Sequence, residues 1–152
     1  MGGTFAAVVA QLAATTPELK LRHQLLVYPF TDLTLTHESM DTYGDGHLLT
    51  RSLMQWFADQ YLGDADPKDP LASPLHASDV SGVAPATVLV AEFDPARDEA
   101  VAYAEKLQAA GVPTQLIEYE GMIHVFFALS GMLSRANVAM DACAAVLREA
   151  LR

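Results

Sequence analysis

The stretch from Ala84 to Phe127 constrains the fold most, because its pattern is that of a strand, a helix and a second strand. Thr87 to Ala91 is a short apolar run rich in β-branched residues, which is typical of a buried parallel strand. From Arg97 to Ala110 the apolar residues recur on one stripe and predict a helix. Thr114 to Tyr119 predicts the second strand. The stretch therefore predicts a βαβ unit with two parallel strands in one sheet.

Turn-forming residues mark the ends of these predicted elements. Asp94-Pro95 interrupts the first strand, and Gly111 ends the helix, whose continuation Pro113 forbids. Glu120-Gly121 predicts a turn out of the second strand. Each strand is thus followed by a loop, and both loops leave the same edge of the sheet.

Asp94 and His124 lie in these two loops, just past the carboxyl ends of the strands. Open α/β sheets place their chemistry at this edge. An Asp that accepts the imidazole N–H fixes the tautomer of a His and leaves its other nitrogen free as a base. A simpler interpretation exists for each residue alone, because Asp before Pro commonly forms a turn and His after Gly commonly packs or lies at the surface.

The remaining segments extend the alternation of helices and strands over the whole chain. Phe5 to Ala14 predicts a helix buried on most sides, because it is small and apolar nearly all round. Leu21 to Phe30 predicts a strand that Pro29 stops. Leu133 to Leu151 predicts a final helix. The sequence therefore predicts an α/β fold with three parallel strands alternating with helices, which is half of a doubly wound sheet.

A helix is also predicted from Ser52 to Leu62, with Thr50 as its N-cap. The helix is predicted to be amphipathic, and its larger apolar residues share one side: Leu53, Trp56, Phe57 and Tyr61. The segments 31–49 and 64–83 are polar or rich in proline and are predicted as loops, and loops of such length commonly carry function.

Composition excludes several classes of function. The chain of 152 residues predicts one domain, and its net charge of −10 argues against binding to nucleic acid or to an anionic membrane surface. No apolar run approaches the length of about 20 residues that spans a bilayer, and no basic leader precedes an apolar run. We expect a soluble, cytoplasmic protein.

Other candidate ligands do not form a site in the sequence. The acids in 31–49 do not have calcium-loop spacing, and Gly44 and Gly46 follow no strand as a nucleotide loop requires. His23 stands early in its strand and is interpreted as structural rather than as a ligand. Cys143 is the single cysteine, so no intramolecular disulfide forms, and its helical setting favours a buried core residue. We expect no metal or cofactor.

Several spaced motifs resemble the hormone-sensitive-lipase-like branch of the α/β-hydrolase esterases over essentially the whole chain. These are Leu26-Val27-Tyr28-Pro29, Tyr61-Leu62-Gly63, Ala72-Ser73-Pro74-Leu75, Glu92 to Glu99 and Gly121-Met122-Ile123-His124. The resemblance implies that Asp94 is the acid and His124 the base of a Ser-His-Asp triad, and that the substrate is a small acyl ester. Asp98 is interpreted as a helix-start residue rather than a catalytic one, because it lies in the first turn of the predicted helix.

The chain also departs from this family. The family's nucleophile lies in G-D-S-A-G-G, and this chain starts Met1-Gly2-Gly3, which is similar to the last three letters of that motif. Met1 and Gly2 then correspond to the remnant of the oxyanion site, and no serine of the chain has a G-x-S-x-G context. Val125 stands where the family usually has Gly after its His.

The departures lead to the interpretation of residues 1–152 as the C-terminal portion of an α/β-hydrolase domain that lacks the N-terminal half. Without a nucleophile no acyl-enzyme forms, so we expect negligible esterase activity from the chain as written. Trp56, Phe57 and the loop 31–49 are candidates to flank the acyl pocket, although packing explains the two aromatic residues equally well.

Two other functions stay open at this point. The chain is alternatively a non-enzymatic relic of the fold that binds a partner or ligand. In that case the strand from Leu21 to Tyr28 has an open edge, through which a homodimer or another partner pairs. A free-standing doubly wound binding domain is the third hypothesis, although no phosphate loop supports it.

Overall fold

Three parallel strands form the sheet, in the same order as in the sequence. They are β1 (Gln24–Val27), β2 (Ala86–Phe93) and β3 (Thr114–Ile123) in a computed structural model that describes all 152 residues. β2 lies in the middle and pairs with both neighbours, whereas β1 pairs with β2 alone. The predicted α/β fold with three parallel strands is confirmed.

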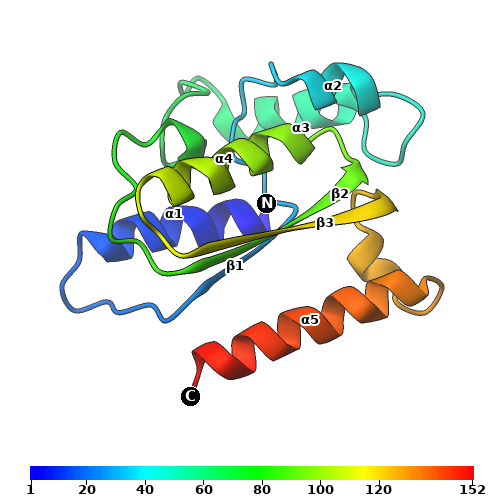
Figure 1. Cartoon of the computed structure of the whole chain (residues 1–152). Coiled ribbons are helices and arrows are strands. Elements are labelled where there is room, and N and C mark those ends of the chain that lie inside the picture. Colours follow the sequence, from blue (N-terminus) through cyan, green and yellow to red (C-terminus); the bar gives the residue numbers. More distant parts are fainter.

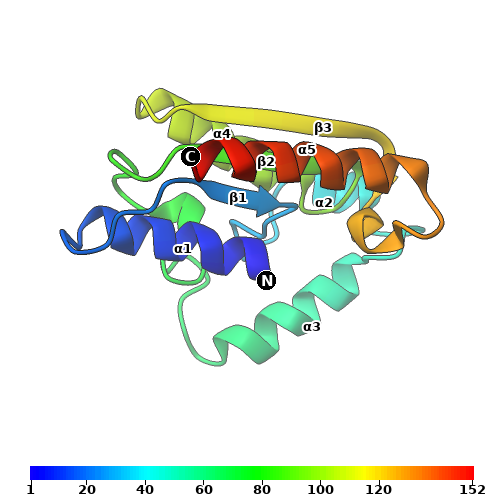
Figure 2. The ribbon, with the colours of Figure 1, turned by 90° about the horizontal axis from the view of Figure 1, so that it is seen from below.

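Helices cover both faces of this sheet. Helices α1 (Gly2–Ala14) and α4 (Arg97–Ala109) lie on one face, and α5 (Ser134–Ala150) lies on the other (Figures 1 and 2). Two further helices, α2 (Glu38–Tyr43) and α3 (Arg51–Leu62), lie near the carboxyl ends of the strands. Short 3-10 helices are η1 (Pro74–His76) and η2 (Phe126–Leu129). No helix is both long enough and apolar enough to cross a membrane.

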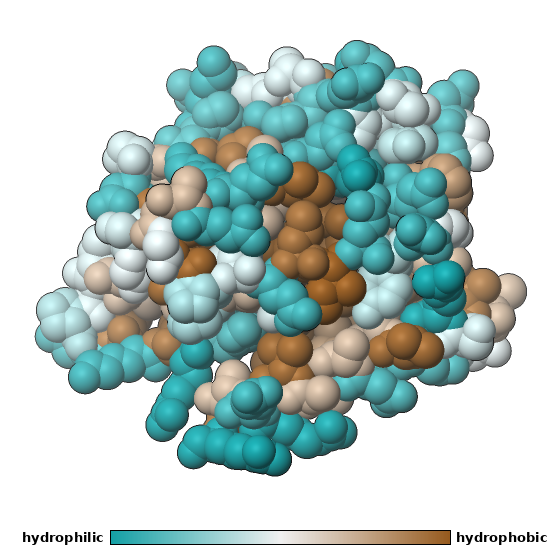
Figure 3. All heavy atoms as spheres, viewed as in Figure 1, coloured by the Kyte–Doolittle hydropathy of each residue, from teal (hydrophilic) through white to brown (hydrophobic).

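The residues of β2 alternate between two hydrophobic cores. Val88 and Val90 pack with Leu107 and other residues under α1 and α4. Leu89 and Ala91 pack on the opposite face with residues of η2 and α5. Burial on both faces explains why this strand reads as a continuous apolar run. Hydrophobic side chains also reach the surface in the region of α4 and β3 (Figures 1 and 3).

The end of β3 differs from the prediction. The strand continues through Glu120-Gly121 to Ile123, and its register with β2 shifts between Ala91 and Phe93. Gly121 has φ +73°, and its N–H donates a 2.7 Å hydrogen bond to Glu92. The predicted turn is therefore an irregularity within the strand, because glycine adopts this backbone conformation without ending the pairing.

The amphipathic helix predicted from Ser52 to Leu62 is α3, but the side with its larger apolar residues is not the side that packs. Met54 and Ala58 are the buried residues of this helix, whereas the four larger apolar residues are 39 to 54% exposed: Leu53, Trp56, Phe57 and Tyr61. Thr50 caps the helix as predicted, since its hydroxyl accepts a hydrogen bond from Leu53 N–H at 3.2 Å. Both sides of the helix carry apolar residues, so periodicity alone did not determine which side packs.

Helix α1 is also less buried than predicted. Ala7, Ala10 and Ala13 contact the core, while Phe5 and Val9 are about half exposed. The small residues allow α1 to lie close to the sheet. A side chain at Gly3 would meet Pro29, because an added Cβ would lie 2.9 Å from the Cβ of that proline.

The segment predicted as a loop from 31 to 49 contains helix α2. The hydroxyl of Ser39 donates to the Pro95 carbonyl at 2.7 Å and accepts from Asp98 N–H at 3.1 Å. These contacts join α2 to the start of α4. They are tertiary, which is why the short polar segment gave no helical pattern in the sequence.

Candidate active site

Asp94 lies directly after β2 and is 1% exposed. One carboxylate oxygen, Oδ1, accepts the backbone N–H of Ala96 at 2.9 Å, and the Asp94 carbonyl accepts Arg97 N–H at 3.0 Å. This is the turn-forming role expected of Asp before Pro. It occupies only one oxygen of the carboxylate, and the other oxygen, Oδ2, faces His124.

His124 lies directly after β3 and is 8% exposed. The next residue, Val125, has φ +70° and begins the turn into η2. This left-handed conformation is favourable for glycine and costly for a β-branched residue. The geometry explains why a Gly suits this position in the family that the sequence resembles.

The side chains of Asp94 and His124 form a direct hydrogen bond. His124 Nδ1 lies 2.6 Å from Asp94 Oδ2. An ionised carboxylate only accepts hydrogen bonds, so the proton of the neutral imidazole lies on Nδ1. Nε2 then carries the lone pair, and no other side chain of the chain hydrogen-bonds to it. The arrangement leaves a base at the carboxyl edge of the sheet.

Two aromatic rings from the end of β1 contact the imidazole of His124. The Phe30 ring is stacked on it, with centroids 5.3 Å apart and an interplanar angle of 11°. The Tyr28 ring is tilted against it, with centroids 4.5 Å apart. Burial, together with the charge of Asp94, raises the pKa of Tyr28, so the phenol stays neutral beside the pair.

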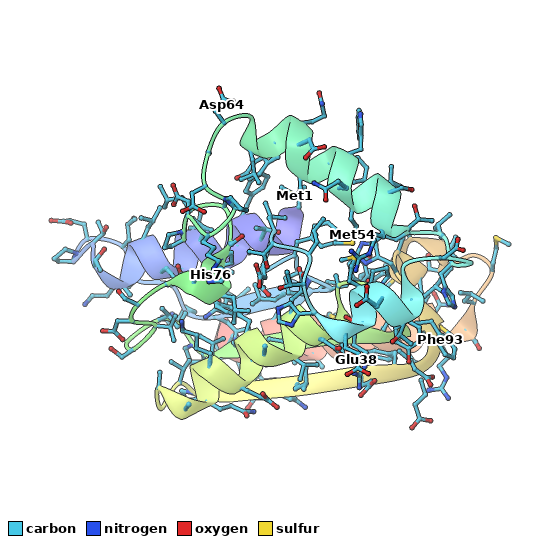
Figure 4. All side chains as sticks on the ribbon, turned by 90° about the horizontal axis from the view of Figure 1, so that it is seen from above. Met1, Glu38, Met54, Asp64, His76 and Phe93 are labelled. Carbon is cyan, nitrogen blue, oxygen red and sulfur yellow. The ribbon has the colours of Figure 1, made fainter.

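Two cavities meet at His124. The first, of about 380 Å³, is lined by apolar side chains from the loop 31–49, α3 and the N-terminus, including Phe30, Leu49, Phe57, Val125 and Met1. The second, of about 340 Å³, is lined by Tyr28 and by residues 1–3. Figure 4 shows Met1 at the start of α1, on the side of this helix nearest α3. The start of α1 therefore borders the same space as His124.

The N-terminus of α1 carries a chemical property of its own. Backbone N–H groups in the first turn of a helix have no partner within the helix, and the helix dipole adds partial positive charge there. Gly2 is the first residue of α1 and lines the second cavity. Met1 and Gly2, singled out from the sequence, thus lie near His124 at a helix end that suits a negative charge.

A second acidic residue is buried behind the site. Glu99, in the first turn of α4, is fully buried, and its Oε1 accepts Thr31 N–H at 2.8 Å. Oε2 has no hydrogen-bond partner. Burial raises the pKa of Glu99 well above its ordinary range. This buried acid joins the segment after β1 to α4, and burial favours its protonated form.

A separate cluster of Asp32 with two histidines fixes the neighbouring loop. His37 and His76 lie 3.1 and 3.0 Å from the two oxygens of Asp32. Burial alone would raise the pKa of Asp32, but the hydrogen bonds from Thr34 N–H and His76 outweigh burial and lower it. The cluster connects the loop 31–49 to η1. No set of His, Cys, Asp and Glu side chains in the chain has the arrangement of a metal site.

The other residues weighed in the sequence have structural surroundings. The His23 ring hydrogen-bonds to Thr87 across β1 and β2, and Cys143 is buried in α5. Asp98 lies in the first turn of α4 and accepts Ser39 N–H at 2.8 Å. No serine hydroxyl in these 152 residues hydrogen-bonds to His124.

The sequence reasoning missed Tyr28, Phe30 and Glu99 as neighbours of the pair. A signal was present for the two aromatic residues. They follow the carboxyl end of β1, which lies at the same edge as Asp94. Glu99 carried no such signal, because acidic residues in the first turn of a helix are common and exposed in most proteins.

Residues 1–128 match a family described as having the alpha/beta hydrolase fold. Among curated relatives, the chain is 45% identical over 138 residues to "Carboxylic ester hydrolase LipN" of Mycobacterium tuberculosis. It is 40% identical over 139 residues to "Ethyl acetate hydrolase" of Pseudomonas putida. These matches include 84% and 90% of this chain, but only 36% and 44% of the relatives, so the chain spans less than half of their length.

Solved structures show the same similarity in three dimensions. The thermostable carboxylesterase EstE1, cloned from a metagenomic library, aligns with a TM-score of 0.95 at 36% identity and includes 99% of this chain and 52% of its own. An esterase of Pyrobaculum calidifontis aligns with a TM-score of 0.93 at 37% identity and includes 97% and 49%. The chain therefore belongs to the α/β-hydrolase fold family of esterases, which confirms the resemblance predicted from its sequence.

Proposed function

We propose that Asp94 and His124 supply the acid and the base of a carboxylic ester hydrolase of the hormone-sensitive-lipase-like type. The observation that supports this most is the 2.6 Å contact between His124 Nδ1 and Asp94 Oδ2, with Nε2 free beside two cavities. The proposal treats residues 1–152 as the C-terminal portion of the hydrolase domain. The cytoplasmic location expected from the sequence stays a prediction.

In this mechanism His124 acts through Nε2. It takes the proton of an attacking serine hydroxyl and later gives it to the leaving alcohol, while Asp94 holds the ring and stabilises its positive form. The serine is expected from a segment ahead of Met1. The oxyanion of the tetrahedral intermediate would lie at the start of α1, near Met1 and Gly2, where N–H groups and the helix dipole stabilise negative charge.

The substrate that fits the site is a small acyl ester. The apolar cavity beside His124 has room for a short hydrocarbon chain, and Leu49 and Phe57 contribute to its wall. Relatives named ethyl acetate hydrolase and arylesterase agree with esters of modest size. The loop 31–49 and α3 are then the elements that flank the acyl group.

A fused protein tests this proposal. The N-terminal half of LipN would be joined ahead of Met1, and hydrolysis of p-nitrophenyl acetate would be followed after circular dichroism shows that the fusion is folded. We expect hydrolysis that His124→Ala reduces by about 10³-fold or more. His23→Ala is the matched control, because His23 precedes β1 at the amino end of the sheet and hydrogen-bonds to Thr87. A folded fusion that hydrolyses the ester equally well with His124→Ala would refute the proposed role.

The 152-residue chain by itself provides a second readout. We expect negligible turnover of the same ester, since none of its serine hydroxyls reaches His124. Turnover by the chain that disappears with His124→Ala would show that a nucleophile within the chain, or an activated water, is sufficient.

A second candidate function follows from the edge of the sheet. β1 pairs with β2 alone, and its other side offers unpaired backbone groups to another strand. In this reading the chain is a hydrolase-like relic that binds a partner, or a second copy of itself, through β1. Light scattering at high concentration tests this second function, because a stable monomer would argue against pairing through the edge of β1.

A further inference from the structure

The segment that connects β1 to the loop 31–49 has an unusual backbone at Tyr28. This residue has φ +35°, although it is not glycine and is followed by proline. Such a conformation costs free energy and persists only where the surrounding structure holds it. With the backbone in this conformation, the rings of Tyr28 and Phe30 both contact the imidazole of His124.

Hydrogen bonds beyond the two rings hold this segment in place. Thr31 N–H donates to Glu99 Oε1 at 2.8 Å, and Thr31 Oγ1 donates to the Glu99 carbonyl at 2.6 Å. Both residues are fully buried. Glu99 lies in the first turn of α4, five residues after Asp94 in the chain. The same helix start thus fixes the acid of the pair and the segment that carries the rings.

We propose that Phe30, with Tyr28 beside it, is a positioning residue for the base, and that its stacked ring holds the His124 imidazole in the plane in which Nδ1–H meets Asp94. The role of Phe30 in positioning a catalytic base rests on the proposed ester hydrolysis, whereas the ring contact between Phe30 and His124 does not. The face of an aromatic ring also attracts a cation, so the stack favours the positive imidazole that forms when Nε2 takes a proton.

The geometry distinguishes this role from ordinary core packing. Phe30 is 6% exposed, and it lines the apolar cavity as well as contacting the imidazole. Its ring is nearly parallel to the imidazole, at 11°, which is an offset stack rather than the tilted contact of most buried aromatic pairs in this chain. A parallel stack resists rotation of the imidazole out of its plane, which a tilted neighbour does not.

Nuclear magnetic resonance on the 152-residue chain tests the proposal without any ester. The readout is the hydrogen-exchange rate of the His124 Nδ1 proton, together with the ¹⁵N shifts that report its tautomer. We expect Phe30→Leu and Phe30→Met to accelerate exchange about three- to tenfold, because the stacking interaction that holds the ring is lost. Phe30→Tyr keeps the ring and should keep the slow exchange.

Phe127→Leu is the matched control, because Phe127 contacts Phe126 and has no ring contact with His124. It should leave the exchange rate of the Nδ1 proton unchanged, even where it lowers the melting temperature. The proposal is wrong if both ring-less variants at position 30 exchange like wild type, or if Phe127→Leu accelerates exchange as much as they do. The two proposals fail separately. If the folded fused protein does not hydrolyse the ester, but Phe30→Leu still accelerates exchange of the Nδ1 proton, the proposed ester hydrolysis is refuted and the contact between Phe30 and His124 stands.

Discussion

His124 Nδ1 lies 2.6 Å from Asp94 Oδ2, although 30 residues separate the two in the chain. The interval is filled by α4 and β3, and β3 is parallel to β2. A parallel pair joined by a helix returns the chain to the same edge of the sheet, so the two loops meet there. The contact is therefore a consequence of topology, completed by the turn at Ala96 that orients the carboxylate.

Replacing Asp94 with Asn should reverse the tautomer of His124. The amide can donate to Nδ1, which then loses its proton to Nε2, the nitrogen that has to act as the base. We expect ¹⁵N spectra of Asp94→Asn to show the proton on Nε2, whereas wild type carries it on Nδ1. Asp79→Asn, at an exposed turn, is the control. An unchanged tautomer in Asp94→Asn would contradict the assigned hydrogen bond.

Val125→Gly should be tolerated far better than most substitutions of valine by glycine. The left-handed backbone at Val125 costs about 1–2 kcal/mol, which offsets the extra chain entropy of glycine. We expect the free energy of unfolding to stay constant or to rise by up to about 1 kcal/mol. Val138→Gly, on the exposed side of α5, should lower it by about 0.5 kcal/mol. Urea unfolding measures both, and a loss at position 125 larger than at 138 would oppose this view.

The two sides of α3 should differ in their contribution to stability. Met54 is 3% exposed and packs in the core below the helix, so Met54→Ala should cost about 2–5 kcal/mol. Trp56 is 54% exposed, and Trp56→Ala should cost less than about 1 kcal/mol. Chemical denaturation of the two variants decides which side packs. The reverse order of the two losses would show that the side with Trp56 packs instead.

Glu99→Gln should change how stability depends on pH. Because burial raises the pKa of Glu99 well above its ordinary 4.5, the stability linked to its bound proton is fully present below pH 4.5. It is lost as the pH rises through the raised, folded-state pKa. Gln mimics the neutral acid at all pH values, so the variant should gain stability relative to wild type between pH 5 and pH 8. Urea unfolding at pH 5 and at pH 8 tests this. A difference in the free energy of unfolding between Glu99→Gln and wild type that is the same at both pH values would contradict it.

The sequence predicted the elements that follow from local pattern. The apolar run Thr87 to Ala91 and the breaker Asp94-Pro95 defined β2 and its end, and the βαβ rule then placed Asp94 and His124 at one edge. The parallel direction of the three strands required only that two crossovers return to the same sheet. These inferences depend on residues close together in the chain, which is why they held.

What the sequence did not predict depends on contacts between distant segments. Helix α2 is joined to α4 through Ser39, and Glu99 is buried by Thr31, 68 residues away. Which side of α3 packs was not predicted, because both sides of the helix carry apolar residues and only the shape of the neighbouring core selects one. The stacking of Phe30 on His124 depends on the strained turn at Tyr28, which no local pattern indicated.

A double-mutant cycle on the fused protein tests most directly whether Asp94 and His124 work as one unit. The rate of p-nitrophenyl acetate hydrolysis would be measured for the fusion, for Asp94→Asn, for His124→Ala and for the double variant, each shown to be folded. Residues that act as a unit are strongly non-additive, so the double variant should be no slower than His124→Ala alone, within about threefold. Losses that multiply, so that Asp94→Asn slows the reaction equally with and without the imidazole, would contradict the assigned pair.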